Sequence, residues 1–546
     1  MNAPGHIVVE LPGGMSRQIP VPGGTASLAD VLALNGLPLN TRCGQRGICR
    51  GCEVSLREGK IDLNGVVVTA PAVIHACRAR PAGGVTIQIP PRSRIEHQPQ
   101  VGETFAIAVP CAHQPLFPPV PGKHDTAFAV DVGTTTVVVL LVDLAAGEVL
   151  ARAGAFNEQI RFGDNVVSRI DAGRSPQAIA SLQRAVVAET IAPLLRRACD
   201  RAGRSADRIA GGAIAGNTTM LHLLSGEDPS SLGVAPFTPR FLAGRRLTAG
   251  QIALAVDGLE PTTPLQLLPG VAAYIGADIT AGIYATGMAF DAAPGLLVDM
   301  GTNGEIVLQN AGKLTACATA AGPAFEGCGL RCGTRARAGA ISDLRLAFNP
   351  FQIEAQTIGN VPLAQAAGLC GSAYLDFLAV ARAGGLIGAT GRFESPAWET
   401  LPAEIRLSGD GERAIRLTNA VGADALRISE ADIAQLLQAK AAIGAGIEIL
   451  LAAAGVHAAD LGRVYLAGGF GMHLDVPHAI AIGLLPGFRA EQVRVVGNTA
   501  LAGALLALLD RTTLEEMEQL RARVSILELN LAPAFEDRYI EHLTLP

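Results

Sequence analysis

Two stretches of this 546-residue chain share one pattern, and this repeat restricts the fold more than any other feature of the sequence. The first, AFAVDVGTTTVVVLLVDLAAGEVL, begins at Ala127, and the second, GLLVDMGTNGEIVLQNAGKL, begins at Gly295. Each consists of a buried strand, an Asp-x-Gly-Thr turn and two further strands. Such an internal duplication predicts two similar α/β halves with a cleft between them.

Both repeated turns carry residue types that suit phosphate binding. Asp131 and Asp299 end the buried strands, the glycines allow a tight reversal, and the hydroxyl and backbone N–H groups of the turn can point at phosphate oxygens. Two carboxylates from facing halves can hold Mg²⁺ together with substrate phosphates. One such turn alone is also common as a plain hairpin. The predicted nucleotide-binding residues of the turns are Gly133, Thr134, Thr135, Gly301, Thr302 and Asn303.

Three further segments extend this prediction. VYLAGGFG is a strand that leads into Gly468 and Gly469, where a backbone without side chains can lie against adenine and ribose. Lys440, in the helical stretch ADIAQLLQAKAAIGAGIEILL, is predicted to reach the nucleotide; the alternative is a solvated helix lysine. Glu326, in AAGPAFEG, is predicted to orient the attacking water, and its alternative is a structural turn residue.

A separate cysteine cluster lies near the N-terminus, in TRCGQRGICRGCEVSLREG. Cys43, Cys49, Cys52 and Cys77 form a C-x5-C-x2-C-x24-C set, which differs by one residue from the plant-type pattern for a [2Fe-2S] cluster. The glycines of the loop give it the tight turns that ligation of an inorganic anion needs. A structural zinc site and unligated thiols are the alternatives, but zinc ribbons prefer two short C-x2-C pairs.

Composition divides the chain and excludes some functions. Its length suggests three or four domains, and eight prolines over 90–121 indicate a linker. The net charge of −6 gives no reason to expect a nucleic acid or an anionic membrane as partner. The N-terminus has no targeting pattern, and the most apolar windows carry charged residues, so we expect a soluble, cytoplasmic protein without membrane spans. Ten cysteines are too few for a disulfide scaffold.

We therefore predict a multidomain chain of mixed α+β and α/β class. The expected parts are a [2Fe-2S] ferredoxin-like domain over 1–92, a Pro-rich linker over 93–125, and the halves of an ATPase fold over 126–294 and 295–546. Within the second half, residues 346–425 do not follow the repeated pattern and are treated as an embellishment.

The motifs resemble known families. The cysteine domain resembles the β-grasp ferredoxins. The paired turns, VYLAGGFG, and the two connecting segments AGNTTMLHLL and VGNTALAGALLAL resemble the five-part pattern of the actin, Hsp70 and sugar kinase superfamily. Together with AGPAFEG, GLCGSAYLDFLAVARAGGLIGATG and KAAIGAGIEILL, the whole chain resembles the ATP-dependent reductive activators of corrinoid proteins.

This resemblance implies a one-electron transfer from a [2Fe-2S] cluster to a Co(II) corrinoid protein of a methyltransferase system, driven by ATP with Mg²⁺. It also implies an upstream electron donor and leaves a homodimer open. Two other functions stay open from the residues: a small-molecule kinase with a redox-sensing ferredoxin domain, and an activator of a radical dehydratase. The first needs a carboxylate base beside its acceptor, and the second binds its cluster through cysteines inside the ATPase fold.

Overall fold

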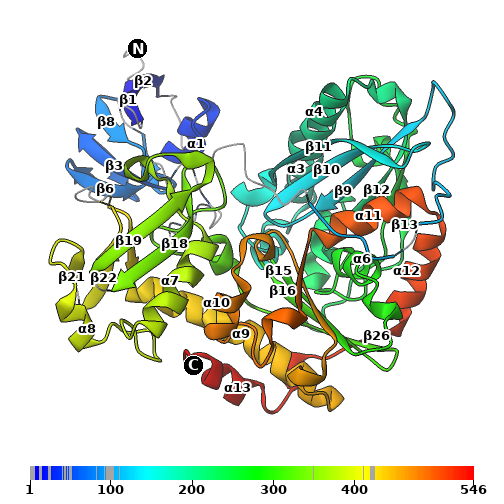
Figure 1. Cartoon of the computed structure of the whole chain (residues 1–546). Helices are drawn as coiled ribbons and strands as arrows, with labels where there is room; N and C mark the ends of the chain where they lie inside the picture. The colour runs from blue at the N-terminus through cyan, green and yellow to red at the C-terminus, as the bar shows by residue number, and fades with distance from the viewer. Residues whose placement is uncertain are drawn as a thin grey trace.

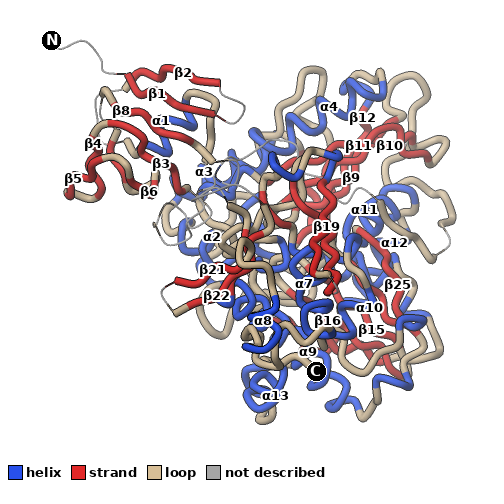
Figure 2. Tube along the Cα trace, turned by 60° about the vertical axis from the view of Figure 1, so that its left-hand side comes forward, coloured by secondary structure: helices blue, strands red, loops and turns tan. Residues whose placement is uncertain are grey.

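The structure is a computed structural model. It describes residues 6–11, 15–21, 26–39, 41, 45, 47, 52–81, 83–90, 93, 104–109, 111–348, 350–409, 411–418 and 425–546. Figure 1 shows a small N-terminal domain, drawn in blue, beside a much larger body. In the rotated view of Figure 2 the same domain still stands at the edge of that body.

The N-terminal domain is a five-stranded sheet with strand order β2-β1-β8-β3-β6. Strands β1 and β8 run parallel and the other neighbours antiparallel, and α1 packs on one face through Leu28, Val31 and Leu32. The helix begins where the Ser27 side chain accepts from the Asp30 N–H. The elements are β1 (His6–Leu11), β2 (Met15–Pro20), α1 (Leu28–Leu34), β3 (Glu53–Glu58), β4 (Lys60–Leu63), β5 (Val66–Thr69), β6 (Ala72–His75), β7 (Ala79–Arg80) and β8 (Val85–Gln88).

The first half of the large body has a six-stranded sheet of order β11-β10-β9-β12-β14-β13. Its central strands are almost entirely buried, as expected of Val- and Ala-rich strands covered by helices on both faces. The elements are β9 (Thr126–Val132), β10 (Thr136–Asp143), β11 (Glu148–Phe156), α2 (Val166–Ala172), α3 (Pro176–Val186), α4 (Ala192–Ala202), β12 (Ile209–Gly216), α5 (Thr218–Leu224), β13 (Arg245–Thr248), β14 (Pro264–Leu267) and α6 (Ala277–Ala285).

The second half has a six-stranded sheet of order β25-β24-β15-β16-β17-β26. Its long helix α9 lies along the sheet and is buried over most of its length. The elements are β15 (Gly295–Met300), β16 (Gly304–Asn310), β17 (Lys313–Thr319), α9 (Glu430–Ala454), β24 (Arg463–Ala467), α10 (Val476–Ala481), β25 (Val493–Gly497), α11 (Thr499–Leu509), α12 (Thr512–Arg523), β26 (Val524–Ile526) and α13 (Phe535–His542).

The two sheets have the same topology, which confirms the predicted fold class. In each, a meander of three antiparallel strands (β9 to β11, or β15 to β17) is extended by a strand parallel to its first member, β12 or β24. Each repeated turn therefore lies at the carboxyl end of a buried first strand and faces the same way in its half.

Helix α11 of the second half packs against α6 of the first half, whereas α5 contacts α2, α3 and β12. Helices α6 and α11 approach closely because Gly503 faces Ala281: a Cβ on Gly503 would lie 2.4 Å from the Ala281 Cβ. A larger residue at Gly503 would therefore push the two helices apart.

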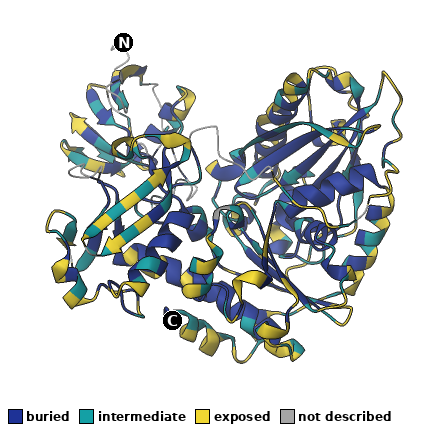
Figure 3. Cartoon of the chain, viewed as in Figure 1, coloured by how far each residue is buried: buried dark blue, intermediate teal, exposed yellow. Residues whose placement is uncertain are grey.

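The 346–425 region belongs to two three-stranded sheets, β19-β18-β20 and β21-β22-β23, which with two helices extend from Ala340 to Ser429. It shares one hydrophobic core with the second half, so it is part of that half and not a separate domain. Figure 3 shows β18 and β19 with exposed and partly buried residues along them. The elements are β18 (Ala340–Phe348), β19 (Phe351–Thr357), β20 (Gly368–Leu369), α7 (Gly371–Ala383), α8 (Ser395–Thr400), β21 (Arg406–Gly409), β22 (Glu412–Arg416) and β23 (Arg427–Ser429).

The predicted linker contains a segment that is bound to the ATPase fold. We call residues 104–109 and 111–124 the strap. Its backbone hydrogen-bonds to β25, α6 and α11: the Ala106 N–H donates to the Val496 carbonyl (3.1 Å), Ala108 to Ala285 (3.0 Å) and Leu116 to Leu508 (2.9 Å). These bonds satisfy backbone N–H groups of a proline-rich stretch whose described residues form no regular strand.

Two helical stretches, Pro176–Ala202 and Glu430–Ala454, are long and apolar enough to cross a bilayer. Half of the most apolar window in the first and 78% of that in the second is buried inside the structure. Their composition is therefore accounted for by core packing.

Candidate functional site: a phosphate-turn cavity and a thiol pair

A cavity of about 460 Å³ lies where the two repeated turns face each other. The turn between β9 and β10, the turn between β15 and β16, the glycine loop after β24 and the short helix Pro323–Glu326 all contribute to it. The predicted residues that line the cavity are Asp131, Gly133, Thr134, Thr135, Asp299, Gly301, Thr302, Asn303, Glu326, Gly468 and Gly469.

Glu326 joins the two turns. The Thr135 hydroxyl, from the first half, donates to Oε2 of Glu326 at 2.7 Å, and the Thr302 hydroxyl, from the second half, donates to Oε1 at 2.8 Å. The two hydroxyl oxygens lie 2.9 Å apart. One carboxylate therefore holds a threonine hydroxyl from each half at the centre of the cavity.

Glycines at the site permit close backbone contacts. A Cβ on Gly133 would lie 2.6 Å from the Thr136 carbonyl oxygen, so the first turn excludes any other residue there. Gly468 has φ +91°, and a Cβ on it would lie 2.8 Å from Oδ1 of Asp299. This glycine thus lets the loop after β24 come up against the carboxylate of the second turn.

Two asparagines that the sequence analysis did not select also reach the first turn. Asn217 caps α5 by accepting from the Met220 N–H (2.9 Å), and its Nδ2 donates to the Thr134 hydroxyl at 2.9 Å. Asn498 caps α11, and its Nδ2 donates to Oδ2 of Asp131 at 2.8 Å. Both lie in the sequence Gly-Asn-Thr directly after a strand, and this repeated tripeptide is the signal that would have identified them.

Four buried carboxyl groups line the cavity, two more than predicted. Burial raises the pKa of Asp131 to about 6, and burial together with the charge of Asp131 raises that of Asp299 to about 7. Burial and the same neighbouring charges raise the pKa of Asp278, and burial and the charge of Asp278 raise that of Glu305. Glu305 is the cross-strand partner of Asp299, and Asp278 lies in the first turn of α6.

This concentration of buried carboxylates fits a cation. Like charges in a low-dielectric site repel each other, and a divalent ion would offset that repulsion. Among the described residues, no three His, Cys, Asp or Glu side chains are arranged as a complete metal site. A Mg²⁺ ion at Asp131 and Asp299 would therefore take most of its ligands from phosphate oxygens and water, as Mg²⁺ commonly does.

The first turn is supported from behind by the segment that follows β11. The Asn157 N–H donates to the Thr135 carbonyl at 2.9 Å, and Asn157 Nδ2 donates to the Gly133 carbonyl at 2.9 Å. Arg169 is fully buried and also donates to the turn, at the Thr134 carbonyl. The carbonyls of Gly133, Thr134 and Thr135 are thus all bonded to the segment behind the turn, which fixes the conformation of the turn.

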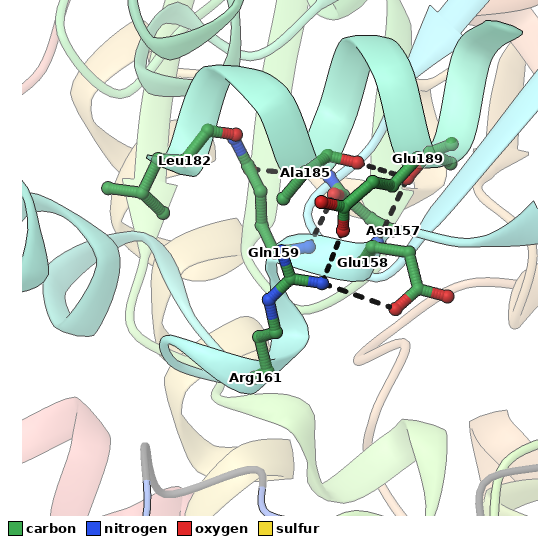
Figure 4. Close-up of polar contacts among 8 residues, drawn as sticks. Asn157, Glu158, Gln159, Arg161, Leu182, Ala185 and Glu189 are labelled. Atoms are coloured by element: carbon green, nitrogen blue, oxygen red, sulfur yellow. Dashed lines mark hydrogen bonds and ion pairs between the residues drawn. The ribbon is translucent and has the colours of Figure 1, made fainter. Parts of the chain in front are cut away.

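Figure 4 shows how this supporting segment is itself held. The Gln159 side chain donates to the Leu182 carbonyl at 2.9 Å, and the Glu158 N–H donates to the Thr190 hydroxyl at 3.1 Å. Thr190 lies in a π-helical turn, Val187–Ile191, between α3 and α4. Such turns are often found near functional sites because they redirect single side chains.

The structure does not bring Lys440 to the cavity. Its side chain is buried near the middle of α9 and faces the last residues of the chain, where Nζ donates to the Thr544 carbonyl at 2.8 Å. Burial lowers its pKa to about 8. Helix α9 is apolar on nearly all sides, so the sequence does not reveal which way one lysine points.

In the N-terminal domain, Cys52 and Cys77 lie beside each other. Cys52 directly precedes β3, whose residue Glu53 pairs with His75 of β6, and this pairing places Cys77 next to Cys52. Both thiols are buried and form no disulfide. The hydrogen bond from Cys77 lowers the pKa of Cys52 to about 6, which favours the thiolate that binds iron.

Cys43 and Cys49 lie outside the described residues, so the full ligand set remains a prediction. One loop glycine is described: Gly47 has φ +75°, the left-handed conformation expected of a tight ligand loop. The adjacent Cys52 and Cys77 thiolates would supply two of the four sulfur ligands of a [2Fe-2S] site.

The fold and the site define a nucleotide-binding protein of the actin, Hsp70 and sugar kinase class with a ferredoxin domain at its N-terminus. Comparisons with known proteins agree. Residues 12–82 match the 2Fe-2S iron-sulfur cluster binding domain, 126–291 match the RACo middle region, and 293–546 match the C-terminal domain of RACo, the ASKHA domain.

The chain belongs to the RACo family. It is 30% identical in sequence to the solved structure of a reductive activator for corrinoid, iron-sulfur protein, with a TM-score of 0.70 and coverage of 99% of this chain and 98% of that one. It is 29% identical to the corrinoid activation enzyme RamQ of Eubacterium limosum, covering 94% and 95% of the two chains. It is 25% identical to a [Co(II) methylated amine-specific corrinoid protein] reductase of Methanosarcina barkeri, covering 76% of each. The predicted family resemblance is thereby confirmed.

Proposed function

We propose that this protein is an ATP-dependent reductive activator of a corrinoid protein. One electron passes from the [2Fe-2S] cluster of the N-terminal domain to Co(II), which becomes the Co(I) nucleophile of a methyltransferase system. The observation that carries the proposal is the pairing, in one chain of the RACo family, of the adjacent Cys52 and Cys77 thiols with the phosphate-turn cavity.

The energetics explain why such an electron transfer needs ATP. Plant-type clusters have reduction potentials of about −400 mV. Each ~59 mV by which the acceptor is harder to reduce than the cluster costs about 1.4 kcal/mol for one electron. The protein can offset this cost only by binding one state of the corrinoid protein better than another. Nucleotide binding and hydrolysis supply the change of state.

The cavity residues then have separate roles. Asp131 and Asp299 hold Mg²⁺, which neutralises phosphate charge when bound, and the hydroxyl and N–H groups of the turns bind phosphate oxygens. Gly468 and Gly469, which line the cavity, would provide the surface for the adenosine. Glu326 orients the attacking water at the point where it now bridges Thr135 and Thr302. A cytoplasmic location and an upstream one-electron donor, which reloads the cluster after each transfer, belong to the same proposal.

The proposal is tested by following Co(I) formation. A corrinoid protein in the Co(II) state is mixed anaerobically with excess reductant and the full chain, with and without ATP, and the Co(I) absorbance is recorded. We expect Co(I) to accumulate only with ATP, and the Co(II) protein to stimulate ATP hydrolysis in return, because coupling between two binding sites is reciprocal.

Two other outcomes would contradict the proposal. Equal Co(I) formation without ATP would show that the ATPase fold has no part in the electron transfer. Phosphorylation of a small molecule, with ATP use independent of the corrinoid protein, would favour the kinase alternative.

A further inference from the structure

Arg335 is a buried cation with unused hydrogen-bonding groups inside the nucleotide cavity. Its side chain is 11% exposed and lines the cavity beside the two turns. Its Nε and Nη2 atoms are buried and have no hydrogen-bond partner among the described residues. The contact with Oε2 of Glu326 is an ion pair of 3.8 Å, too long for a hydrogen bond, and the guanidinium lies over the Phe156 ring at 5.5 Å.

A second buried arginine nearby, Arg169, makes the hydrogen bonds expected of an arginine with a structural role. Arg169 donates from Nε to the Gly163 carbonyl at 3.1 Å, from Nη1 to Gln159 at 3.1 Å, and from Nη2 to the Thr134 carbonyl. Burial and the charge of Arg335 together lower the pKa of Arg169 to about 9. Arg335 therefore repels Arg169, and its Nε and Nη2 donors find no acceptor among the described residues, which indicates that their partner is a ligand.

The backbone around Arg335 is firmly placed. The Thr334 N–H donates to the Leu369 carbonyl at 2.8 Å, and a Cβ on Gly327 would lie 2.4 Å from the Thr334 carbonyl oxygen. The loop between the Pro323–Glu326 helix and β18 thus folds tightly against itself and presents Arg335 to the cavity. A cation fixed in this way needs little rearrangement to bind a developing negative charge.

The charge pattern of the cavity identifies the ligand. Buried carboxylates, Asp131 and Asp299 among them, suit a divalent cation, while Arg335 offers a planar donor group beside the phosphate turns. A polyphosphate with its metal is the ligand that needs both, because the metal neutralises one set of oxygens and a guanidinium can bind another in a bidentate way.

We infer that Arg335 binds the terminal phosphate of ATP and stabilises the charge that develops on it during hydrolysis. In that step the oxygen of water bonds to the terminal phosphorus, the bond from phosphorus to the bridging oxygen breaks, and ADP leaves with that oxygen. The proton released by the water passes to solvent, and Arg335 stays protonated throughout. Glu326, 3.8 Å away, positions the guanidinium until the nucleotide arrives. The inference rests on the proposed function, since it assigns a residue to its nucleotide site.

The test compares the full-length Arg335→Gln variant with the parent protein. Calorimetric titration measures the affinity for ADP and for a non-hydrolysable ATP analogue, each with Mg²⁺. We expect the affinity for the triphosphate analogue to fall about tenfold or more, as for loss of a charge-assisted hydrogen bond, and the ADP affinity to change less than about threefold. Hydrolysis should fall about 10²-fold, and Arg335→Lys, which keeps the charge but not the planar fork, should recover only part of either loss.

Arg345→Gln is the matched control, because Arg345 is an exposed arginine on β18 whose partner is Asp343 at 3.3 Å. It should leave both affinities unchanged. Unchanged preference for triphosphate over diphosphate in Arg335→Gln would overturn the inference. If the parent protein itself bound no nucleotide, the proposed function would fail as well, so the two failures are distinguishable. Retained ADP binding shows that the variant is folded.

Discussion

Replacing Asp299 with asparagine is expected to lower the rate of ATP hydrolysis by about 10³-fold, and Asp131→Asn should do the same. Each substitution removes one of the two carboxylates proposed to place Mg²⁺ on the phosphates, and a metal contributes several kcal/mol to the stabilisation of the transferred charge. The measurement is steady-state phosphate release with saturating Mg²⁺ and ATP. The optical spectrum of the cluster should stay the same, since it belongs to a separate domain.

The unfolding temperatures of these two variants show whether they are folded. Burial raises the pKa of both carboxyl groups, which means that their ionised forms destabilise the nucleotide-free protein. Each variant should therefore unfold at the same or a higher temperature than the parent. Asp171→Asn, on the exposed surface of α2, is the matched control for hydrolysis. Parent-like activity in both Asp131→Asn and Asp299→Asn would mean that the two turns are hairpins without a catalytic role.

The second large effect is expected in the N-terminal domain. Cys52→Ala should abolish the [2Fe-2S] cluster, because four thiolates are needed and Cys52 is both buried and adjacent to Cys77. Iron and sulfide analysis of anaerobically purified protein should give about two of each per chain in the parent and none in the variant. ATP hydrolysis without a corrinoid protein should be unaffected.

Cys111→Ala serves as the control for cysteine loss, since Cys111 is exposed and lies in the strap. It should remain red-brown with full iron content. A colourless parent protein that contains stoichiometric zinc would contradict the cluster assignment and support the zinc alternative.

The sequence allowed the prediction of those site residues that belong to a repeated local pattern. Asp131 and Asp299 end equivalent strands, and duplicated strands place them at equivalent edges. Glu305 reaches the site through its register with Asp299, and Asp278 reaches it at the start of α6. Neither placement could be predicted, because it depends on contacts between distant segments and no local sequence pattern marks it. The position of Lys440 was predicted wrongly for a different reason. A helix that is buried on nearly every side has no polar face to reveal its orientation.

The strap shows a further limit of structure prediction from sequence. Its prolines predicted a connection that is poor in regular structure, which is correct as far as local conformation goes. Its hydrogen bonds run to Val496, Ala285 and Leu508, which are distant in sequence. Composition describes the conformational preferences of a segment but cannot reveal which backbone groups elsewhere will satisfy its N–H and carbonyl groups.

The strap also begins beside the nucleotide site. The Asn498 N–H donates to the Thr104 carbonyl at 3.1 Å, and the same residue holds Asp131 through its side chain. Only residues 94–103 separate Thr104 from Ser93, which is hydrogen-bonded to Glu53 of the ferredoxin domain. Such a tether can reach at most about 40 Å, so the cluster is confined near the ATPase at an effective concentration in the millimolar range, however dilute the protein. Encounters with the corrinoid protein and with the electron donor then depend on concentration, and dilution should slow cobalt reduction without separating the cluster from the site that consumes ATP.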